Sequence, residues 1–564
     1  MTYRVLSVYL LAFWAFFAFR TIDQVPLGYL HSWNQITSLS FVDSVRTMPE
    51  RWYETRDVTT RVTWEKEGIA IDSGDRYQRF IVYEEFPLYH ILAAFVADMV
   101  DTISSGILPG VSASVIAART LSMIFFMAMV VGLLYRGGHL VRGERFFLLF
   151  LVTSSFPLVF YSTAPMSDVA MTCGIIFSCL SLEKYCRCRK RGDSGRIWFL
   201  LSVLFLGIAT LFKSYAVVWM PALIVQYSAE ERGRYRGRTS YRSLAGVILL
   251  VVFVSLPVFV WHFWPRSIGH SEVISHVFWR KLEVVFSGQI ISVIWKNWFR
   301  YFGYLTGLLT LAFLVLKYIL GRLADSRILP LSIPVEIASL AAVTGIVIFP
   351  AERIFLIFSL PYLFLSADKL PHHDYYFFPV VMLLCPVVSR FLAQLAVGVQ
   401  GVIADKGRTA IVVIFIVLST GISVSKVLKA QRVNSDVVQC AKLVSDSTVD
   451  SELIATWTDL SRYNSIAYIS GRKAVNIEGE AFHPNRYRRA GASVLVIDLP
   501  KNEYPMAHEW AVSHGVSAPY LTQAMSVRHG GPVERICALY RLSGKTVMRE
   551  NSNETKVPRT ASLQ

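Results

Sequence analysis

Long apolar segments alternate with short polar ones along the first 430 residues or so of the chain. A helix needs about 20 mostly apolar residues to cross a hydrocarbon core about 30 Å thick. By that measure, membrane-spanning helices are expected near residues 4–20, 113–135, 146–162, 169–184, 197–212, 214–228, 244–262, 301–320, 353–367, 376–397 and 409–427. No small-residue cleavage site follows the first run, so it is interpreted as an anchor and not as a removed signal peptide.

Two further apolar runs, 88–105 and 328–349, are ambiguous as spans. The first contains two aspartates, and the second contains a glutamate and is interrupted by two prolines. If both crossed the membrane, the chain would have thirteen spans instead of about eleven. The sequence therefore predicts an all-α polytopic membrane protein with about 11–13 transmembrane helices.

Composition and charge agree with a membrane protein. Of the 564 residues, 54% are hydrophobic and only 17% are charged, against about 25% in ordinary soluble domains. Mean hydropathy is +0.45. The net charge of +16 would also suit a nucleic-acid-binding protein, but the basic residues cluster in short loops between apolar runs. In that position they set membrane topology, and no nucleic-acid partner is expected.

The basic loops favour one orientation in the membrane. They read RGGHLVRGER, KYCRCRKRGDSGR, AEERGRYRGRTSYR and LKYILGRLADSR, and the positive-inside rule places all four in the cytoplasm. This requires 88–105 to lie along the outer interface and 328–349 to be re-entrant or interfacial. The N-terminus is then inside, and the C-terminus is outside.

This topology divides the chain into a transmembrane domain at 1–430, with outer loops at 21–87 and 263–299, and a C-terminal part outside the membrane. The runs ELIATW, SIAYIS and SVLVIDLP have the length of short strands and predict a small extracytoplasmic α/β domain at 431–545. Residues 546–564 are polar and are expected to be a disordered tail. Of seven cysteines, only Cys440 and Cys537 fall in the C-terminal part. Either a disulfide or two separate thiols would fit them.

Unusual polar residues gather on the predicted outer face. Ionisable groups at membrane depth are costly and mark functional sites by default. They include Lys213 in an apolar segment, Arg266 and Arg280 in the second outer loop, and the cluster SADKLPHHDYYFFP at 366–379. The alternative is a set of interfacial anchors and an aromatic belt. For the tyrosines Tyr375 and Tyr376 taken alone, the two interpretations are about equally good.

The order of these motifs resembles the GT-C type membrane glycosyltransferases, particularly the lipid A aminoarabinose transferase and protein O-mannosyltransferase group. EEFPL resembles the family's motif after the first outer loop and places Glu84 on its glutamate. Asp168 matches the outer-turn aspartate, and FKSY supplies Lys213. The cluster at 366–379 is similar to the family motif with Ser366, Lys369, Leu370, Pro371 and then Tyr375 or Tyr376. The resemblance covers roughly residues 1–400 and implies a GT-C architecture.

One departure from the family changes the expected chemistry. The family's catalytic Asp-Glu pair lies shortly after the first span, where this chain reads YLHSWNQITSL and has Asn34 and Gln35. Amides hold hydroxyls or phosphates but do not accept a proton at neutral pH. We therefore expect the base elsewhere, with Asp374 and His373 as first candidates and Glu84 as the alternative. A divalent metal held by His372, His373 and Asp374 is left open.

The resulting hypothesis is a glycosyltransferase that uses a polyprenyl-phosphate-linked sugar at the outer face of a bacterial inner membrane. The acceptor is a lipid, a glycan or a protein. No Gly-rich nucleotide-binding motif is present, which fits a lipid-linked donor. Besides the candidate catalytic residues, the expected substrate-binding residues are Asn34, Gln35, Asp168, Lys213, Arg266, Lys369, His372, Tyr375 and Tyr376. The rival hypotheses are a non-catalytic transporter or flippase of lipid-linked glycans, and a glycan polymerase or ligase.

Overall fold

The structure is a computed structural model, and the elements below come from the parts of the chain that it describes. These are residues 2–22, 32–47, 54–55, 81–82, 87–104, 113–135, 142–234, 241–263, 289–302, 362, 373–398, 405–430, 435–449, 451–458, 460–476, 487–488, 491–526 and 534–542. The chain divides into two compact units. One combines Met1–Asp23 with Tyr83–Lys429, and the other combines Gln24–Val82 with Ala430–Gln564. Residues 24–82 of the outer loop expected at 21–87 thus group with the C-terminal residues, whereas the sequence suggested a loop of the transmembrane domain.

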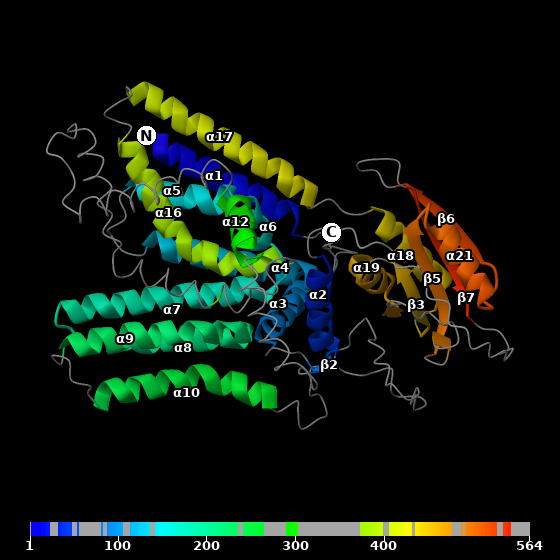
Figure 1. Ribbon diagram of the computed structural model, residues 1–564, viewed down its shortest axis with the longest axis horizontal. Helices are drawn as coiled ribbons and strands as arrows, with labels where there is room; N and C mark the ends of the chain where they lie inside the picture. The colour runs from blue at the N-terminus through cyan, green and yellow to red at the C-terminus, as the bar shows by residue number, and fades with distance from the viewer. Residues whose placement is uncertain are drawn as a thin grey trace. The chain divides into compact units, whose positions relative to one another are not determined.

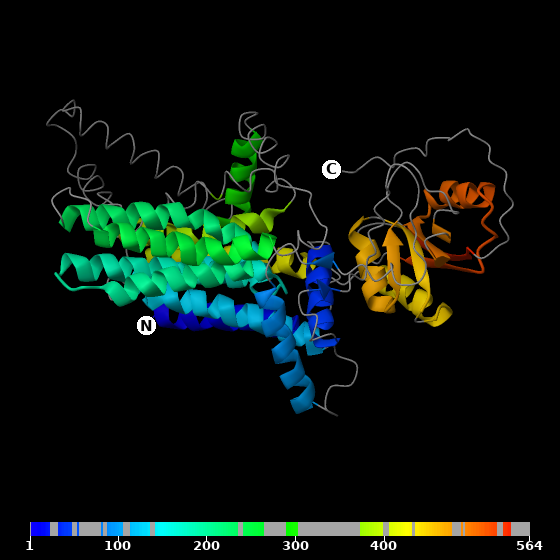
Figure 2. The ribbon, with the colours of Figure 1, turned by 90° about the horizontal axis from the view of Figure 1, so that it is seen from below.

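The first unit is helical throughout its described parts. Its elements are α1 (Thr2–Arg20), α3 (Leu88–Ser104), α4 (Ala113–Tyr135), α5 (Arg142–Ser154), α6 (Phe156–Ser162), α7 (Ser167–Lys190), α8 (Arg196–Phe212), η3 (Ser214–Trp219), α9 (Met220–Arg234), α10 (Tyr241–Phe263), α12 (Gln289–Phe302), η5 (Asp374–Phe377), α16 (Phe378–Gly398) and α17 (Asp405–Ala430). Helices α7, α8, α9 and α10 run side by side (Figure 1). Helix α12 runs across their direction (Figure 2).

Within these described parts, α4 and α7 are long and apolar enough to cross a membrane, and the bent pair of α5 and α6 makes a third span if it counts as one. Helices α8, α10, α16 and α17 contain shorter apolar stretches. The expected spans at 301–320 and 353–367 and the ambiguous run at 328–349 lie outside the described residues, apart from two residues of α12 and Tyr362. The number of crossings therefore stays a prediction.

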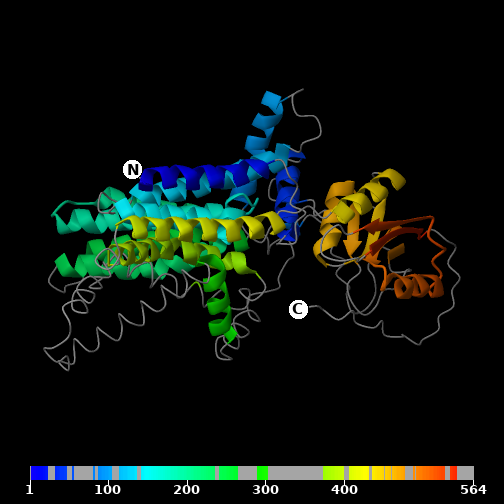
Figure 3. The same cartoon turned by 90° about the horizontal axis from the view of Figure 1, so that it is seen from above.

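The span expected at 146–162 is broken in the structure. Helices α5 and α6 meet at an angle of 71°, and the residue between them, Ser155, is extended. A proline at position 157, in the first turn of α6, explains the break. Its ring clashes with the backbone of a preceding helical turn, so a helix that began upstream cannot continue through it. The ambiguous run at 88–105 is a helix, α3, which packs on α4; in Figure 3 it runs at an angle to the long helices of this unit.

The second unit contains a mixed sheet flanked by helices. Its elements are α2 (Ser32–Thr47), β1 (Glu54–Thr55), β2 (Ile81–Val82), α18 (Ser435–Ser447), β3 (Leu453–Thr458), α19 (Leu460–Ser470), β4 (Lys473–Asn476), β5 (Ala492–Pro500), α21 (Tyr504–Ser513), β6 (Leu521–Ser526) and β7 (Glu534–Arg541). Strand order in the sheet is β4-β3-β5-β7-β6. Strand β3 is parallel to β4 and β5, and β7 is antiparallel to β5 and β6.

Strand β5 forms the centre of this domain because both of its faces are buried. Side chains of a strand alternate between faces, so Val494 and Val496 join the apolar cluster that includes α18 and α19. Leu495 and Ile497 join the opposite cluster, which includes residues of α21. The predicted small α/β domain is thus present, with helices on both faces of the sheet.

One predicted strand of this domain is wrong. ELIATW and SVLVIDLP correspond to β3 and β5, but SIAYIS lies in helix α19. Its buried residues include Arg462, Ser465, Ile466 and Ser470, which recur at intervals of three or four. That period places them on one face of a helix, and the short apolar run alone did not show it.

Cys440 and Cys537 form a disulfide, which answers the question that the sequence left open. It joins α18 to β7 over a Cα–Cα distance of 5.7 Å and a sequence separation of 97 residues. In the chain-entropy model, closing a loop of this length stabilises a domain by about 4–5 kcal/mol. The disulfide is therefore a major constraint on how α18 packs against the sheet.

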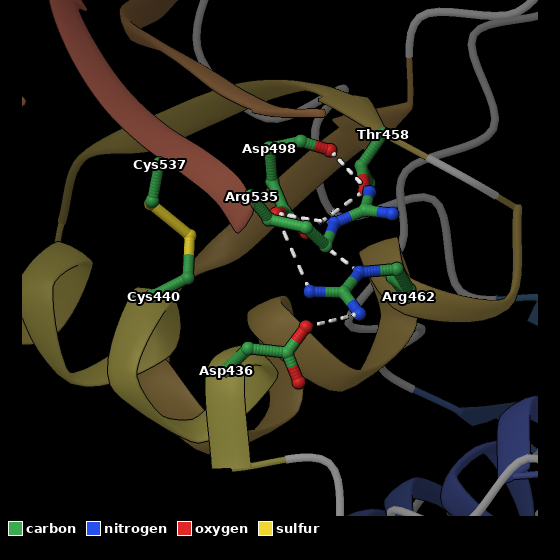
Figure 4. Close-up of polar contacts among 7 residues, drawn as sticks. All are labelled: Asp436, Cys440, Thr458, Arg462, Asp498, Arg535 and Cys537. Carbon is green, nitrogen blue, oxygen red and sulfur yellow. Dashed lines mark hydrogen bonds and ion pairs between the residues drawn. A yellow bond between two sulfur atoms is a disulfide. The ribbon is translucent and has the colours of Figure 1, made fainter. Parts of the chain in front are cut away.

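A buried network of charges lies beside the disulfide (Figure 4). The carboxylate of Asp498 accepts hydrogen bonds from Arg462 Nε at 2.7 Å and Thr458 Oγ1 at 3.1 Å, and it forms an ion pair with Arg535 at 3.3 Å. Arg462 also pairs with Asp436 at 2.8 Å. Two cations meet two anions, so the buried charges are compensated. Loss of one member would leave a buried charge unpaired.

We predict that the C-terminal domain loses stability in acid partly through Glu452. Although burial raises the pKa of Glu452, hydrogen bonds from the Val449 N–H, Arg541 and Ser493 hold it below its ordinary value of 4.5. A carboxyl with a depressed folded-state pKa stabilises the fold above its unfolded pKa, and this contribution disappears as pH falls through the folded pKa. Glu452→Gln should flatten the dependence of thermal stability on pH below about 4.5, as scanning calorimetry would show; an unchanged pH profile would contradict this role.

Candidate active site

The candidate site is built where helices of the first unit begin or break. Asp168 lies in the first turn of α7 and is buried. A carboxylate is favoured there because the unpaired N–H groups of a helix N-terminus carry partial positive charge. The preceding turn, residues 163–166, connects α6 to α7. It contains a proline, which prevents α6 and α7 from forming one continuous helix.

Lys213 lies at a second break. Its backbone is extended, with φ −159° and ψ 120°, between the end of α8 and the start of η3. Its Nζ donates to both carboxylate oxygens of Asp168, at 2.9 and 3.0 Å. Both side chains are less than a tenth exposed. Each charge therefore offsets the energetic cost of burying the other. A lone ammonium in this position would have no such compensation.

Tyrosine rings surround the ammonium group. Lys213 Nζ lies 4.8 Å from the ring centroid of Tyr376 and 5.4 Å from that of Tyr375. Both distances are within the range of cation–π attraction. Tyr215 from η3 meets Tyr376 edge to face, and Tyr161 from α6 does the same with Tyr375. Four tyrosines from three elements thus pack around one ion pair.

Polar contacts from α4 fix the turn before Asp168. Arg119 donates to the carbonyl of Thr163 at 2.8 Å, and Ser122 Oγ donates to the carbonyl of Ala164 at 2.7 Å. Tyr89 of α3 bonds to Ser122 in turn, at 2.8 Å. Carbonyls at the end of a helix have no partner inside it, so these side chains satisfy them. The position of Asp168 is consequently set by α3 and α4 as well as by α7.

Comparison with known proteins agrees with this geometry. Residues 99–261, which contain Asp168 and Lys213, match the family model described as dolichyl-phosphate-mannose-protein mannosyltransferase. The structure is similar to ArnT from Cupriavidus metallidurans in the apo state, with a TM-score of 0.52, 11% identity and coverage of 94% of this chain and 97% of ArnT. ArnT bound to undecaprenyl phosphate gives a TM-score of 0.50, 10% identity and coverage of 95% and 98%.

The fold is that of the GT-C membrane glycosyltransferases. The resemblance inferred from the motifs is thereby confirmed. Among curated proteins, none matches the chain.

In this GT-C fold, several sequence-predicted residues come together. Asp168, Lys213, Tyr375 and Tyr376 form the site described above. His373 precedes η5, and its ring centroid lies 5.5 Å from that of Tyr375. Interfacial anchoring was the alternative for the two tyrosines. Both are nine-tenths or more buried around Lys213, which favours the site.

Other predicted residues are not placed in this group. Asp374 begins η5, and Asn34 and Gln35 lie in α2 of the second unit. Gln35 is buried. The remaining candidates lie outside the described residues: Glu84, Arg266, Arg280, Lys369 and His372. Within the described parts, no three His, Cys, Asp or Glu side chains are grouped to hold a metal ion, and the question of a metal at 372–374 stays open.

Arg119, Tyr161 and Tyr215 belong to the site but were not expected from the sequence. Arg119 is a charged residue within an apolar span, so the rule that singled out Lys213 also applies to it. The two tyrosines gave no such signal, because single aromatic residues are common near membrane interfaces. Their role follows only from the packing of η3 and α6 against η5.

Proposed function

We propose that this chain transfers a sugar from a polyprenyl-phosphate donor to a hydroxyl acceptor. The observation that carries the proposal is the buried Asp168–Lys213 pair surrounded by tyrosines at the helix breaks of a GT-C fold. A lipid donor stays in the bilayer, so its phosphate–sugar linkage lies at the depth where helices begin and end.

Charge accounts for the role of Lys213. As the bond between the anomeric carbon and the lipid phosphate oxygen breaks, negative charge grows on the departing phosphate. A preorganised cation in a site of low dielectric stabilises that charge more than it would in water. Lys213 supplies the cation, and Asp168 holds its ammonium in place before the donor binds. Arg266 and Arg280 are proposed as further phosphate contacts.

The acceptor side requires a base and a surface for the sugar. The acceptor hydroxyl forms a new bond to the anomeric carbon while its proton passes to a base, for which Asp374 with His373 is our first candidate and Glu84 the second. Tyr375 and Tyr376 provide aromatic surface beside the cation. Asn34 and Gln35 are proposed to hold sugar hydroxyls or phosphate oxygens through their amides. Inversion at the anomeric carbon is expected from a single displacement.

ArnT, one of the proteins with a similar fold, has been crystallised with undecaprenyl phosphate. This supports a polyprenyl-phosphate donor for the present chain. The transporter alternative predicts two related halves and charged sites near the bilayer midplane, but the sequence has no internal repeat. The Asp168–Lys213 pair lies at the first turn of α7 and not at its middle. A polymerase or ligase would use the same donor and differ only in its acceptor.

We further propose that the site and the C-terminal domain face outward in a bacterial inner membrane. Helix α7 has 24 residues, with Asp168 in its first turn and Arg187, Arg189 and Lys190 in its last. At 1.5 Å per residue it is about 36 Å long, enough to cross a membrane. Basic residues favour the cytoplasmic end, which puts Asp168 outside. The Cys440–Cys537 disulfide agrees, because disulfides persist in oxidising compartments.

Sidedness gives a direct prediction. A reporter enzyme that works only outside the cytoplasm, fused after residue 430, should be active in cells. Alkylation of the native protein should leave Cys440 and Cys537 unmodified until a reductant is added. Cytoplasmic activity of the fusion, or free thiols without reductant, would overturn the orientation.

The function itself is tested by transfer with the purified full-length protein. A radiolabelled sugar on a short-chain polyprenyl phosphate is incubated with lipid, glycan and peptide acceptors from the same cells. Mass spectrometry of surface glycans in a deletion strain identifies the acceptor class. Transfer to any acceptor with release of lipid phosphate supports the proposal. Movement of intact lipid-linked sugar across vesicles without transfer would support the flippase alternative instead.

A further inference from the structure

The disulfide of the C-terminal domain joins its first described helix to its last described strand. Cys440 of α18 and Cys537 of β7 are 97 residues apart in the sequence, and both are completely buried. Both belong to the apolar cluster on one face of the sheet, which also contains residues of α19. The bond therefore holds α18 against the sheet.

Helix α18 also contributes Asp436 to the buried charge network beside the disulfide (Figure 4). Asp436 precedes Cys440 by four residues, about one turn, so the two side chains lie on the same face of α18. In the sheet, Cys537 is directly opposite Asp498 of β5, and residues paired in this way lie on the same face. The cysteine and the carboxylate of α18 thus reach adjoining parts of one buried site.

Arg462 of α19 links the carboxylate of α18 to the sheet. Its guanidinium pairs with Asp436 at 2.8 Å and with Asp498 at 2.7 Å, and Asp498 also faces Arg535 at 3.3 Å. All four residues are less than a tenth exposed. If α18 moved away, Arg462 would keep, within the described contacts, one carboxylate that it shares with Arg535. Two buried cations beside one anion are poorly compensated, so the network favours the docked position of α18.

The remaining contacts of α18 hold its first turns less well. Its other almost completely buried apolar residues are Val437, Ala441 and Val444, whose small side chains bury little apolar area. Arg472 donates to the hydroxyl and to the carbonyl of Thr448, at 2.8 and 2.7 Å, but these bonds act at the C-terminal end of the helix. The first turns of α18 therefore depend on the ion pair and on the disulfide.

We propose that the disulfide and the charge network act together as a redox-dependent latch that docks α18 on the sheet. The latch consists of Asp436, Cys440, Arg462, Asp498, Arg535 and Cys537. While the disulfide is intact, it keeps the turn of Asp436 against Arg462, so the ion pair survives local fluctuations. Once the disulfide is reduced, loss of the ion pair frees the helix. This inference does not rest on the proposed transferase activity.

The latch closes by thiol–disulfide exchange with an oxidant that carries a disulfide of its own, such as a thiol–disulfide oxidoreductase. One cysteine thiolate attacks that disulfide and forms a mixed disulfide, and the second thiolate then attacks it to form the Cys440–Cys537 bond. The oxidant leaves as a dithiol and retains the two electrons and two protons. Such oxidants act in oxidising compartments, so in the orientation proposed above α18 docks stably only after export.

The experiment measures hydrogen exchange of the α18 amides in the purified full-length protein, before and after reduction. Alkylation confirms that reduction of the two cysteines is complete. Asp436→Asn removes the charge that α18 contributes. Lys501→Met is the matched control, because it breaks the ion pair from Lys501 to Glu534 in the same domain, whose side chains are about half exposed or more. Cys440→Ser combined with Cys537→Ser controls for unspecific effects of the reductant.

Reduction of the wild-type protein should speed exchange in α18 about tenfold or more. Asp436→Asn should change exchange less than about threefold while the disulfide is intact, but about thirtyfold or more after reduction, because the helix then has neither restraint. Lys501→Met should behave like the wild type in both states. The double serine variant should exchange like the reduced wild type and should not respond to reductant.

Two results would overturn the latch. One is unchanged exchange in α18 after complete reduction of the wild type, and the other is an equal effect of Asp436→Asn in the two redox states. If the double serine variant does not accumulate in cells, the comparison of oxidised and reduced wild type and Asp436→Asn still decides. None of these measurements requires transfer activity, so failure of the proposed function would leave the test intact.

Discussion

Replacing Lys213 with methionine is expected to weaken donor binding at least thirtyfold and to destabilise the transmembrane unit at the same time. The donor effect follows from loss of a desolvated cation opposite a phosphate, which costs about 2 kcal/mol or more. The stability effect follows because Asp168 would remain buried without its partner, since both side chains are less than a tenth exposed. Breaking such a pair costs about 3–5 kcal/mol. Donor titration and thermal unfolding measure the two effects separately.

A second substitution separates binding from stability. Lys213→Met combined with Asp168→Asn removes both charges, so stability should largely recover while donor affinity stays low. Arg390→Met is the control for unspecific damage, because it breaks another ion pair of the bundle, from Arg390 to Glu144 at 2.9 Å, outside the candidate site. It should lower stability without changing donor affinity. Wild-type affinity in the double variant would refute the phosphate-binding role of Lys213.

The helices of the first unit were largely predictable, because a membrane span leaves a strong signal in the sequence. Ala113–Tyr135 was expected at those residues and is helix α4. The break at Ser155 was not expected, since hydropathy averages over a window and does not register one proline. In the C-terminal domain, strands β3 and β5 are apolar and were recognised. Strands β6 and β7 were not recognised. Strand β6 contains polar residues such as Gln523, and the apolar run of β7 is only five residues long, between Arg535 and Arg541.

The candidate site was predictable to the extent that it contains charges in apolar surroundings. That rule identified Lys213 from the sequence, the family motif supplied Asp168, and the structure pairs the two. It did not predict the pairing itself, which depends on α7 and α8 packing side by side. The attachment of α2 to α19 was equally inaccessible, because the Asp43–Tyr468 contact joins residues 425 positions apart and neither residue is unusual in its own segment.

The catalytic base gives the last prediction. Asp374→Asn and His373→Ala should each reduce single-turnover transfer by about 100-fold or more, the usual contribution of general base catalysis, while donor binding stays within a few-fold of wild type. A histidine has an ordinary pKa of about 6.5 and an adjacent carboxylate can orient its ring. The two residues are neighbours at the start of η5, which also carries the tyrosines around Lys213. The base would therefore lie at the same element as Tyr375 and Tyr376, the aromatic residues beside the Lys213 ammonium.

Two further variants decide between this base and one in the first outer loop. Asn34→Asp only restores what relatives carry, so it should be tolerated. Glu84→Gln should impair donor binding more than the chemical step, because that position supports binding in the family it resembles. If Asp374→Asn and His373→Ala retain near-normal rates while Glu84→Gln is inactive, proton transfer belongs to Glu84. The role of η5 would then be limited to holding Tyr375 and Tyr376 against Lys213.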